Sequence, residues 1–320
     1  MKLVVGFLAY NEVSAKYLGE FLPSLRKALD FLPKPEFKIL AFDNSEEDTK
    51  INRLAIEFFF RENPEEVGYY SQGKNLGFGA AYNFLIKKAK ELEADYFLML
   101  NPDTCLAPDA ISLLMAALEE KKELAAASPK ILRWNFSELK KTKQIDSVGL
   151  VLKPGLKFID LGQGEEDKGQ YDQAEILGPS GAAGLFRLSA LEAIKEKDNY
   201  FDEQFFMYKE DCDLAYRLHK NNLKSVLVPK AIIYHDRTAA FYGRGIRAFF
   251  LNRRQLSKRV RAWSFRSQHF LFIKHFKTEN LASRLLVLIK VFILFFFSLI
   301  LEQFNLKEYK NIKKYWQSID

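Results

Sequence analysis

The chain has 320 residues and a formal net charge of +7, and hydrophobic residues make up 48% of it. This length suits one large domain with an appendage, or two domains, and it excludes a chain too short to bury a sizeable core. The two cysteines, Cys105 and Cys212, are too few for a disulfide scaffold. We expect both to be reduced and buried in a cytosolic protein, and we expect no signal peptide, because no cleavage pattern follows an apolar region at the start of the sequence.

The charge is divided unevenly along the chain. Residues 241–320 hold 16 Lys and Arg against 4 Asp and Glu, whereas residues 1–240 hold 32 against 37. A weakly acidic body is therefore followed by a strongly basic tail. This asymmetry predicts that the tail contacts something anionic, either a membrane surface or nucleic acid.

Strands and helices alternate in the first part of the chain. The apolar pattern predicts strands at residues 2–9, 37–42, 67–70 and 96–100, and helices at 14–32 and 80–92. Pro33 and Pro35 end the first helix, and Pro108 opens another before a strand that begins near residue 124. This alternation predicts an α/β fold with a mostly parallel central sheet and helices on both faces.

The chain is less regular after residue 135. Residues 135–178 are rich in Gly, Lys and Asp, so short strands and a mobile loop around 162–173 are expected there. Helices are predicted to begin near Ser189 and Glu210, and late strands end at His235. We therefore predict a main domain at residues 1–238 and a helical basic and apolar tail at 239–320.

The tail contains an apolar run that resembles a membrane segment. Residues 285–301 are apolar except for Lys290 and Ser298. A spanning helix needs roughly 20 apolar residues, so this run is at the short edge of that range. Basic residues flank it on both sides, which favours a helix lying in the membrane interface. A spanning helix, a buried core helix and a dimer helix are the alternatives.

Polar residues follow the first two predicted strands. Asn11 follows the first strand, and Asp43-Asn44-Ser45 follows the second. In an open α/β sheet such positions line the ligand crevice. The Asp43 carboxylate could there accept a hydrogen bond from a pyrimidine ring N–H, with Asn11 in the same pocket. A simple Asx turn at Asp43 is the alternative.

The segment 75–83 reads Asn-Leu-Gly-Phe-Gly-Ala-Ala-Tyr-Asn, and its small residues let the backbone approach a ligand closely. Gly77 and Gly79 lack the third glycine of the dinucleotide fingerprint, and the sequence has no Gly-Lys-Ser/Thr phosphate loop. The alternative is a helix N-terminus that packs tightly on the sheet.

Asn101-Pro102-Asp103-Thr104 places a carboxylate directly after a buried strand. A divalent cation held by Asp103 would neutralise a diphosphate leaving group, whereas a capped turn is the alternative. Asn101 stands where a second Asp would add charge, so we expect a cation to bind together with the nucleotide. His235 could complete this metal site as a neutral imidazole, although a lone His is more often structural.

Glu210 and Asp211 are adjacent carboxylates that follow four apolar or aromatic residues. Burial and like charge can raise a carboxyl pKa towards that of a useful general base. The alternative is the acidic first turn of a helix, which suits the helix dipole.

As a set, these motifs resemble those of family 2 glycosyltransferases with the GT-A fold, within the rhamnosyltransferase-like branch. The resemblance covers roughly residues 3–236. It also rests on the Gly-Ala-Ala-Gly segment at 181–184, on the run from Phe201-Asp202 to Asp213-Leu214, and on Pro229 before His235. Several motifs in the right order and spacing make the resemblance specific, and Asn101 is the departure from the usual two-carboxylate metal motif.

The resemblance implies an inverting transfer from a nucleoside-diphosphate sugar, dTDP-rhamnose or a UDP-sugar, to a hydroxyl of a glycan or lipid-linked acceptor. Asp211 would be the catalytic base, with Glu210 beside it, and Asp103 with His235 would bind Mg²⁺ or Mn²⁺. The implied nucleotide-binding positions are Ala9, Asn11, Asp43, Asn44, Asn75, Gly77, Asn101 and Asp103. The implied floor below the donor sugar and acceptor is Gly181, Ala182, Ala183 and Gly184.

On this interpretation the protein acts in cell-surface polysaccharide synthesis. It would be peripheral on the cytoplasmic face of the cell membrane, where each Lys or Arg near an anionic surface contributes about 1 kcal/mol. A nucleotidyltransferase is disfavoured, because residues 9–16 are not a basic, Gly-rich phosphate loop. The rival hypothesis is an inactive protein that binds a nucleotide-sugar or nucleic acid. The apolar run suits lipid better than nucleic acid, and Asp103 and Asp211 argue against an inactive site.

Overall fold

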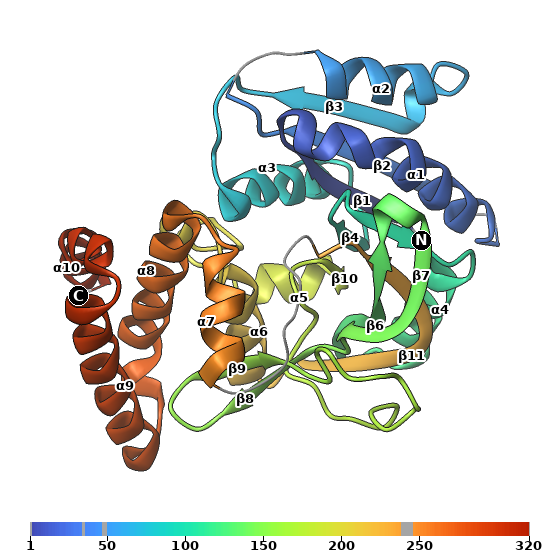
Figure 1. Cartoon of the computed structure of the whole chain (residues 1–320). Helices are drawn as coiled ribbons and strands as arrows, with labels where there is room; N and C mark the ends of the chain where they lie inside the picture. The colour runs from blue at the N-terminus through green and yellow to red at the C-terminus, as the bar shows by residue number, and fades with distance from the viewer. Residues whose placement is uncertain (1, 34–35, 47–49, 238–245, 320) are drawn as a thin grey trace.

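The computed structural model describes residues 2–33, 36–46, 50–237 and 246–319 (Figure 1). Its strands are β1 (Lys2–Ala9), β2 (Glu36–Asp43), β3 (Val67–Ser71), β4 (Tyr96–Leu100), β5 (Thr104–Leu106), β6 (Leu124–Asn135), β7 (Lys140–Ser147), β8 (Leu150–Lys153), β9 (Lys157–Asp160), β10 (Ala183–Arg187) and β11 (Lys224–His235). Its α-helices are α1 (Asn11–Asp30), α2 (Ile51–Phe59), α3 (Phe78–Glu91), α4 (Ala110–Glu120), α5 (Leu188–Ala193), α6 (Glu210–Lys220), α7 (Ile246–Arg254), α8 (Lys258–His275), α9 (Leu281–Ile300) and α10 (Glu308–Ile319).

A mixed sheet forms the centre of the molecule. Within the described residues its nine strands follow the order β3-β2-β1-β4-β10-β6-β11-β5, and β7 pairs with β6. β3, β2, β1 and β4 pair in parallel, as do β6 and β11. β10 runs antiparallel to both β4 and β6, so those two strands point the same way. The predicted mostly parallel sheet is confirmed, and the carboxyl ends of β1, β2, β4 and β11 meet at one edge.

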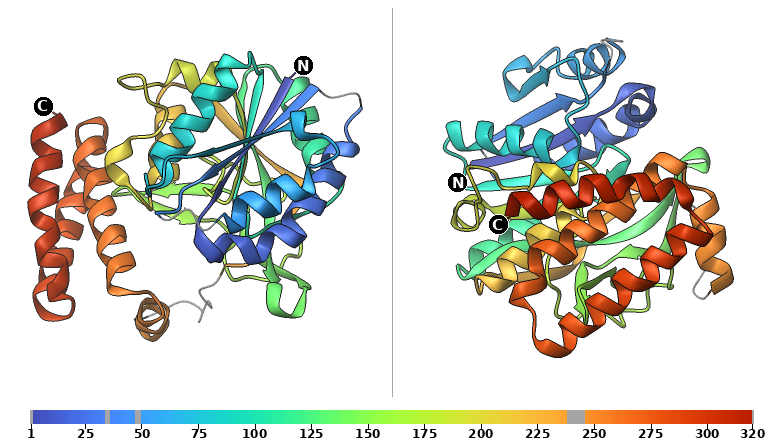
Figure 2. Two further views of the ribbon diagram at one scale, coloured as in Figure 1. Left: turned by 90° about the horizontal axis from the view of Figure 1, so that it is seen from above. Right: turned by 90° about the vertical axis from the view of Figure 1, so that its left-hand side faces the viewer.

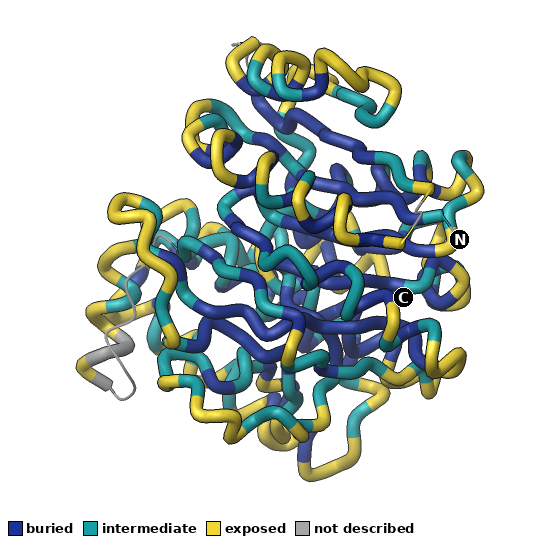
Figure 3. Tube along the Cα trace, turned by 90° about the vertical axis from the view of Figure 1, so that its right-hand side faces the viewer, coloured by how far each residue is buried: buried dark blue, intermediate teal, exposed yellow. Residues whose placement is uncertain are grey.

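Helices cover both faces of the sheet, as predicted (Figure 2). Alternate side chains of β1 point to opposite faces, because a strand has a two-residue period. Val5 belongs to the core shared with Phe21 of α1 and Leu114 of α4. Its neighbour Val4 belongs to the core shared with Leu85 of α3 and with helices α5 and α6. The strands are accordingly the most continuously buried part of the chain (Figure 3).

Several elements differ from the sequence prediction, and the short strand β5, which was not predicted, is one of them. α1 begins at Asn11, so this residue opens the helix with φ 44°. The nine-residue α2 was not predicted: half of its apolar side chains, Ile51, Leu54 and Phe58, are exposed, and only a short stripe is buried. β10 was not predicted as a strand either. Its five residues begin with Ala183-Gly184, which carry little strand propensity, and pairing with β4 and β6 fixes their conformation.

The tail helices pack on the body of the molecule through a common apolar core. This core joins Phe158 of β9 and Tyr216 of α6 to Phe270 and Leu271 of α8 and Tyr315 of α10. The predicted domain boundary at 238/239 lies outside the described residues, and the division into domains stays a prediction. In Figure 2, α8, α9 and α10 form an outer layer beside the body.

α9 lies on the outside of this layer. It is the one helix of the described ranges that is long and apolar enough to cross a membrane, with 20 residues and a mean hydropathy of 2.3. Only 17% of its most apolar stretch is buried, so α9 is not a core helix of this chain. Lys290, the charged residue in its middle, donates a hydrogen bond to the carbonyl oxygen of Pro154 at 3.0 Å and another to that of Gly155, in the β8–β9 turn.

Candidate active site

A cavity of about 570 Å³ lies at the sheet edge where β4 and β11 end. It brings together seven of the predicted site residues: Asn101, Asp103, Gly181, Ala182, Glu210, Asp211 and His235. Four parts of the chain supply them, because the turn after β4, the end of β11, the turn before β10 and the start of α6 all reach this edge. The predicted metal and catalytic residues therefore share one cavity.

Asp103 and His235 form the predicted metal pair. The His235 Nε2 atom lies 3.3 Å from Asp103 Oδ2. The other carboxylate oxygen, Asp103 Oδ1, is buried and has no hydrogen-bond partner among the described residues. Burial lowers the pKa of His235, but the charges of Asp103 and Asp146 outweigh it and raise that pKa to about 10. An oxygen without a partner beside an imidazole nitrogen fits a divalent cation, which would displace the imidazole proton.

Asp103 and His235 alone supply too few ligands for a complete metal site. No group of three or more His, Cys, Asp or Glu side chains in the described part of the chain is arranged to hold a metal ion. A cation at Asp103 and His235 would therefore take its remaining ligands from a bound diphosphate and from water. The arrangement agrees with the expectation that cation and nucleotide bind together.

Two further residues support His235 and were missed by the sequence analysis. Asp146 Oδ2 lies 2.8 Å from His235 Nδ1, and Asp146 is fully buried. The Arg237 Nε atom lies 3.1 Å from Asp146 Oδ1, and Arg237 Nη2 lies 3.3 Å from Asp160 Oδ2. Burial would raise the pKa of Asp146, but the hydrogen bond to His235 and the charge of Arg237 lower it to about 2. The ionised carboxylate orients the imidazole so that Nε2 faces Asp103.

A sequence signal for these residues exists but is weak. Asp146 stands between the apolar residues Ile145 and Val148, which is unusual for a charged side chain in a strand, and Arg237 lies two positions after His235. Neither pattern identifies a partner. The pairing of β7 with β6 and of β6 with β11 brings Asp146 beside His235, and this pairing is not readable from the local sequence.

Glu210 and Asp211 open α6 at the wall of the cavity. Asp211 Oδ2 accepts a hydrogen bond from the backbone N–H of Gly181 at 2.9 Å, and Oδ1 accepts one from the N–H of Cys212 at 2.8 Å. Glu210 is buried, and its Oε2 atom has no hydrogen-bond partner within the described residues. Burial and then the charge of Asp211 raise the pKa of Glu210 to about 8. Glu210 thus keeps its proton near neutral pH and does not repel Asp211.

The residues predicted to form the floor below the donor sugar, 181–184, lie at the start of β10 and just before it. Ala183 and Gly184 are the first residues of β10 and are buried between β4 and β6. The Ala182 carbonyl accepts a hydrogen bond from the Asn101 N–H at 2.9 Å, which fixes Asn101 against the floor. Gly181 and Ala182 line the cavity, whereas Ala183 and Gly184 do not.

The predicted nucleoside residues gather at the carboxyl ends of β1 and β2. Asp43 Oδ1 accepts a hydrogen bond from the Ser45 N–H at 3.1 Å, so the Asx-type turn is present. Asp43 Oδ2 accepts from Tyr69 Oη at 2.7 Å and from Asn52 Nδ2 at 3.3 Å. The carboxylate is thereby buried and engaged within the protein. Its contact with a base stays a prediction.

Ala9, Asn11 and Asn44 are likewise engaged. The Asn44 N–H donates to the Ala9 carbonyl at 2.8 Å, and the Asn11 N–H donates to Ser45 Oγ at 2.7 Å. The Asn44 side chain accepts from the Leu76 N–H at 2.7 Å and donates to the Gly77 carbonyl at 3.2 Å. Asn44 therefore fastens the 75–77 segment to the end of β2.

The 75–77 segment is shaped by its own polar residue. Asn75 Oδ1 accepts a hydrogen bond from the Gly77 N–H at 2.9 Å, and Gly77 has φ 80°. A Cβ atom at Gly77 would lie 2.3 Å from the Phe206 carbonyl oxygen, which no side chain allows. Gly77 is thus required by close packing against Phe206, and contact of Asn75 and Gly77 with a nucleotide stays a prediction.

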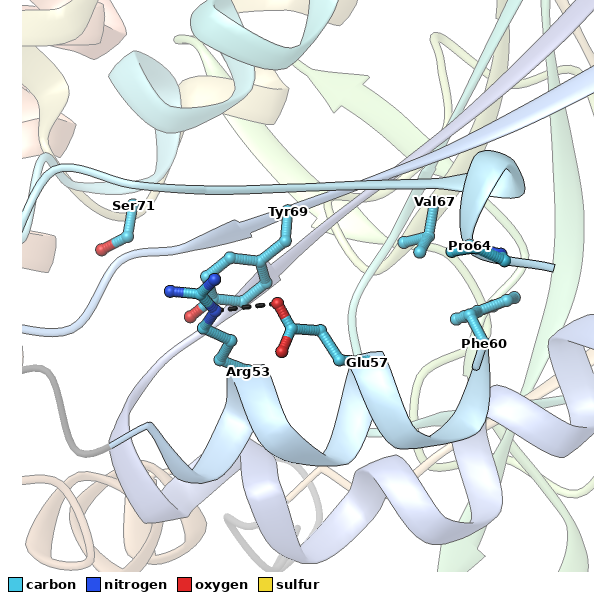
Figure 4. Close-up of a pocket in the computed structure, with 7 residues that line it drawn as sticks. All are labelled: Arg53, Glu57, Phe60, Pro64, Val67, Tyr69 and Ser71. Carbon is cyan, nitrogen blue, oxygen red and sulfur yellow. Dashed lines mark hydrogen bonds and ion pairs between the residues drawn. The ribbon is translucent and has the colours of Figure 1, made fainter. Parts of the chain in front are cut away.

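A second hollow, of about 460 Å³, lies between α2 and β3 (Figure 4). Arg53 and Glu57 of α2 face Tyr69 of β3 across it, and Arg53 Nε lies 2.8 Å from Glu57 Oε1. Tyr69 connects this hollow to Asp43 through its hydroxyl. The sequence analysis did not predict it, because α2 itself was not predicted.

The sequence of this chain matches that of a known protein family. The sequence profile described as Glycosyl transferase family 2 matches residues 5–195. The N-acetylglucosaminyl-diphospho-decaprenol L-rhamnosyltransferase of Mycobacterium tuberculosis is 27% identical over 252 residues, which are 73% of this chain and 76% of that protein.

Solved structures agree on the fold. Residues 1–349 of TarS from S. aureus give a TM-score of 0.53 at 20% identity, over 99% of this chain and 80% of that one. The mannosyltransferase PcManGT from Pyrobaculum calidifontis, in complex with GDP-Man and Mn²⁺, gives 0.53 at 13% identity over 97% and 73%. GalNAc-T7 with UDP, GalNAc and Mn²⁺ gives 0.54 at 13% identity over 88% and 52%. These are GT-A transferases, and Mn²⁺ is present with two of them.

Proposed function

Because the chain belongs to glycosyl transferase family 2 and is a glycosyltransferase, we propose that it transfers a sugar to an acceptor hydroxyl with inversion, using Asp211 as the base. One observation carries the proposal. A carboxylate held by two backbone N–H groups shares a cavity with a carboxylate–imidazole pair that fits a divalent cation. The Asp211 carboxylate would remove the proton of the acceptor, and a cation held by Asp103 and His235 would neutralise charge on the diphosphate.

The proposed reaction is a single displacement at the anomeric carbon of a nucleoside-diphosphate sugar. The acceptor oxygen forms a bond to that carbon while the bond to the diphosphate oxygen breaks with its electron pair. Asp211 takes the proton of the acceptor hydroxyl. Mg²⁺ or Mn²⁺ held by Asp103 and His235 would neutralise charge on the diphosphate. The Gly181 and Cys212 N–H groups keep the Asp211 carboxylate in one orientation throughout.

For the donor we propose dTDP-rhamnose first and a UDP-sugar second. The support is the rhamnosyltransferase that is 27% identical to this chain. That protein's name describes a lipid-linked acceptor, and we propose a glycan or lipid-linked acceptor here, in cell-surface polysaccharide synthesis. The basic tail is consistent with an acceptor that lies in a membrane.

We also propose that α9 holds the protein on the cytoplasmic face of the cell membrane. Large apolar side chains are exposed along it: Leu281, Leu285, Leu286, Leu288, Ile289, Phe292, Ile293, Phe295, Phe296, Leu299 and Ile300. Lys290 is held by the β8–β9 turn instead of facing outward. An apolar outer face with the charge turned inward suits a helix lying in the interface better than one crossing the hydrocarbon core.

The first test combines nucleotide binding with turnover. Thermal unfolding is measured with UDP, dTDP and GDP, each with and without Mn²⁺, because a ligand of the native state raises its stability. One nucleotide is expected to raise the melting temperature in a metal-dependent manner. Its sugar derivatives then serve as donors for wild type and Asp211→Asn, and the variant is expected to lose about 10²- to 10⁴-fold in transfer.

The same experiment contains its control. Asp211→Asn leaves the metal pair intact, so its stabilisation by nucleotide and Mn²⁺ should match that of the wild type. Equal transfer by the variant would show that another group is the base. A folded wild-type protein that responds to none of the three nucleotides would favour the inactive binding protein.

A further inference from the structure

The turn that leads into the catalytic pair has a strained backbone. Phe206, Tyr208 and Lys209 have φ values of 60°, 71° and 73°, and none of them is glycine. Residues with a Cβ seldom adopt this left-handed region. Such a conformation persists only where surrounding contacts fix it, and it is common beside functional groups. Residues 205–209, called here the base turn, are followed directly by Glu210 and Asp211.

One side of the base turn is held by the Gly-rich segment. The Phe78 N–H donates to the Phe206 carbonyl at 2.7 Å. Gly77 packs so closely on the same carbonyl that no side chain fits there. These contacts fix the position of Phe206 from the side of the Gly-rich segment.

The other side is held by α8 of the tail. Ser267 is fully buried, and its Oγ lies 3.1 Å from the carbonyl oxygen of Phe205 and 3.1 Å from that of Met207. The hydroxyl can donate to either carbonyl, and these two carbonyls belong to the residues on either side of Phe206, the first strained residue. The Phe206 ring packs on Trp263 of α8 at a centroid distance of 5.1 Å, and Phe205 packs on Phe270 at 5.7 Å.

We propose that Ser267 is a positioning residue for Asp211, acting through the base turn, so that α8 is part of the catalytic machinery. This proposal rests on the proposed function of Asp211 as base. The Ser267 hydroxyl bonds to the base turn, and the base turn leads directly into Glu210, the first residue of α6. The position of α6 in turn places the Asp211 carboxylate where it accepts the hydrogen bond from the Gly181 N–H. Among the described residues, Ser267 is the one hydrogen-bond donor to the Met207 carbonyl. Removal of its hydroxyl therefore leaves that carbonyl without a donor, and the strained base turn relaxes.

The test compares Ser267→Ala with Ser298→Ala. Ser298 is also fully buried in the tail, but its hydroxyl donates only to the Leu294 carbonyl of its own helix at 2.8 Å among the described contacts. Hydrogen exchange of the full chain without ligand is measured for peptides covering residues 205–211. Steady-state kinetics follow with the sugar derivative of the stabilising nucleotide that the wild type uses as donor. Ser267→Thr, which restores a hydroxyl, is the conservative variant.

We expect Ser267→Ala to accelerate exchange at residues 205–211, whereas Ser298→Ala does not. We expect kcat to fall about 10- to 100-fold in Ser267→Ala, because small misplacements of a catalytic group have effects of that size. The KM for the donor should stay within about twofold, since the nucleotide residues are untouched, and Ser267→Thr should recover most of kcat.

Two results would overturn the proposal. Unchanged exchange at residues 205–211 in Ser267→Ala would show that the hydroxyl does not hold the turn, whether or not the protein is a transferase. Faster exchange with kcat unchanged would show that the turn does not position the base. Absence of transfer by the wild type would instead refute the proposed function, while the exchange measurement would still report on the turn.

Discussion

The adjacent carboxyl groups of Glu210 and Asp211 lie in one cavity but have different surroundings. Asp211 accepts hydrogen bonds from two backbone N–H groups, whereas Glu210 is buried and its Oε2 atom finds no hydrogen-bond partner among the residues that the structure describes. The raised pKa of Glu210 means that the folded state disfavours its charge. Below pH 4.5, the ordinary value, Glu210 is protonated in both the folded and unfolded states. From there to about pH 8 the unfolded chain loses the proton and the folded chain keeps it, so this group increasingly lowers stability as pH rises.

Glu210→Gln removes that titration. The melting temperature of the variant relative to wild type should therefore be higher at pH 9 than at pH 5, by on the order of 5 °C. Thermal unfolding at both pH values checks this. Glu138→Gln is the control, because Glu138 is an exposed side chain in a short 3-10 turn. An equal difference at the two pH values would contradict the raised pKa.

Asp146 makes a second prediction at this scale. Because it orients His235, Asp146→Asn should weaken Mn²⁺-dependent nucleotide binding about 10- to 100-fold. Titration of Mn²⁺ at a fixed nucleotide concentration, followed by thermal unfolding, measures the effect. Asp236→Asn is the matched control, since the Asp236 carboxylate accepts from Tyr17 Oη at 2.7 Å and the adjacent His235 is bonded to Asp146 instead. A similar loss in both variants would assign the effect to general destabilisation.

At the scale of elements, α9 carries the proposed membrane contact. Leu285, Phe292 and Ile293 are 59%, 65% and 58% exposed. Changing all three to Ser should reduce co-sedimentation with anionic vesicles at least about tenfold, because each buries apolar surface in the interface. Ile51, Leu54 and Phe58 of α2 offer a control with the same three residue types, exposed by 41%, 62% and 69%.

The outcomes distinguish two roles of α9. Loss of vesicle binding in the α9 variant alone supports the interfacial helix. Unchanged vesicle binding would refute it. If the α9 variant instead changed from a dimer to a monomer in light scattering, with vesicle binding intact, α9 would be the dimer helix that the sequence left open.

Elements with a strong pattern were predictable from the sequence. The strands ending at Ala9, Asp43, Leu100 and His235 have continuous apolar runs followed by polar residues, and the parallel topology brings those ends together. Contacts between distant segments were not predictable. The bond between Asp146 and His235 spans 89 residues, and that between Ser267 and Met207 spans 60. Only tertiary packing determines such pairs, so the cavity was predicted while its supporting residues were missed.

At the scale of the whole molecule, the tail helices complete the core. Asp213 of α6 is fully buried, and it pairs with Lys274 and His275 of α8 as well as with Arg217. Phe205 and Tyr216 are buried in the core that α8 and α10 share. Removal of the tail would expose this apolar surface and leave part of the buried charge unpaired, which is strongly destabilising.

A chain ending at residue 237 should therefore fail to unfold cooperatively and should aggregate in size-exclusion chromatography. The triple α9 variant should instead keep a melting temperature close to that of wild type, because its changed side chains are exposed. If the shortened chain had a melting temperature within a few degrees of wild type, the tail would be a separable anchor.

The close approach of Gly77 to the Phe206 carbonyl has a consequence for engineering. Asn83, in the same Gly-rich segment, also accepts hydrogen bonds from the N–H groups of Tyr200 and Phe201, at 3.0 Å and 2.8 Å. Residues 75–83 and 200–209 therefore form one packed interface, and the surfaces of the two segments fit each other. A chimaera that imports either segment alone from a relative would bring mismatched surfaces together. A chimaera should keep the melting temperature of the parent protein only when both segments are exchanged together.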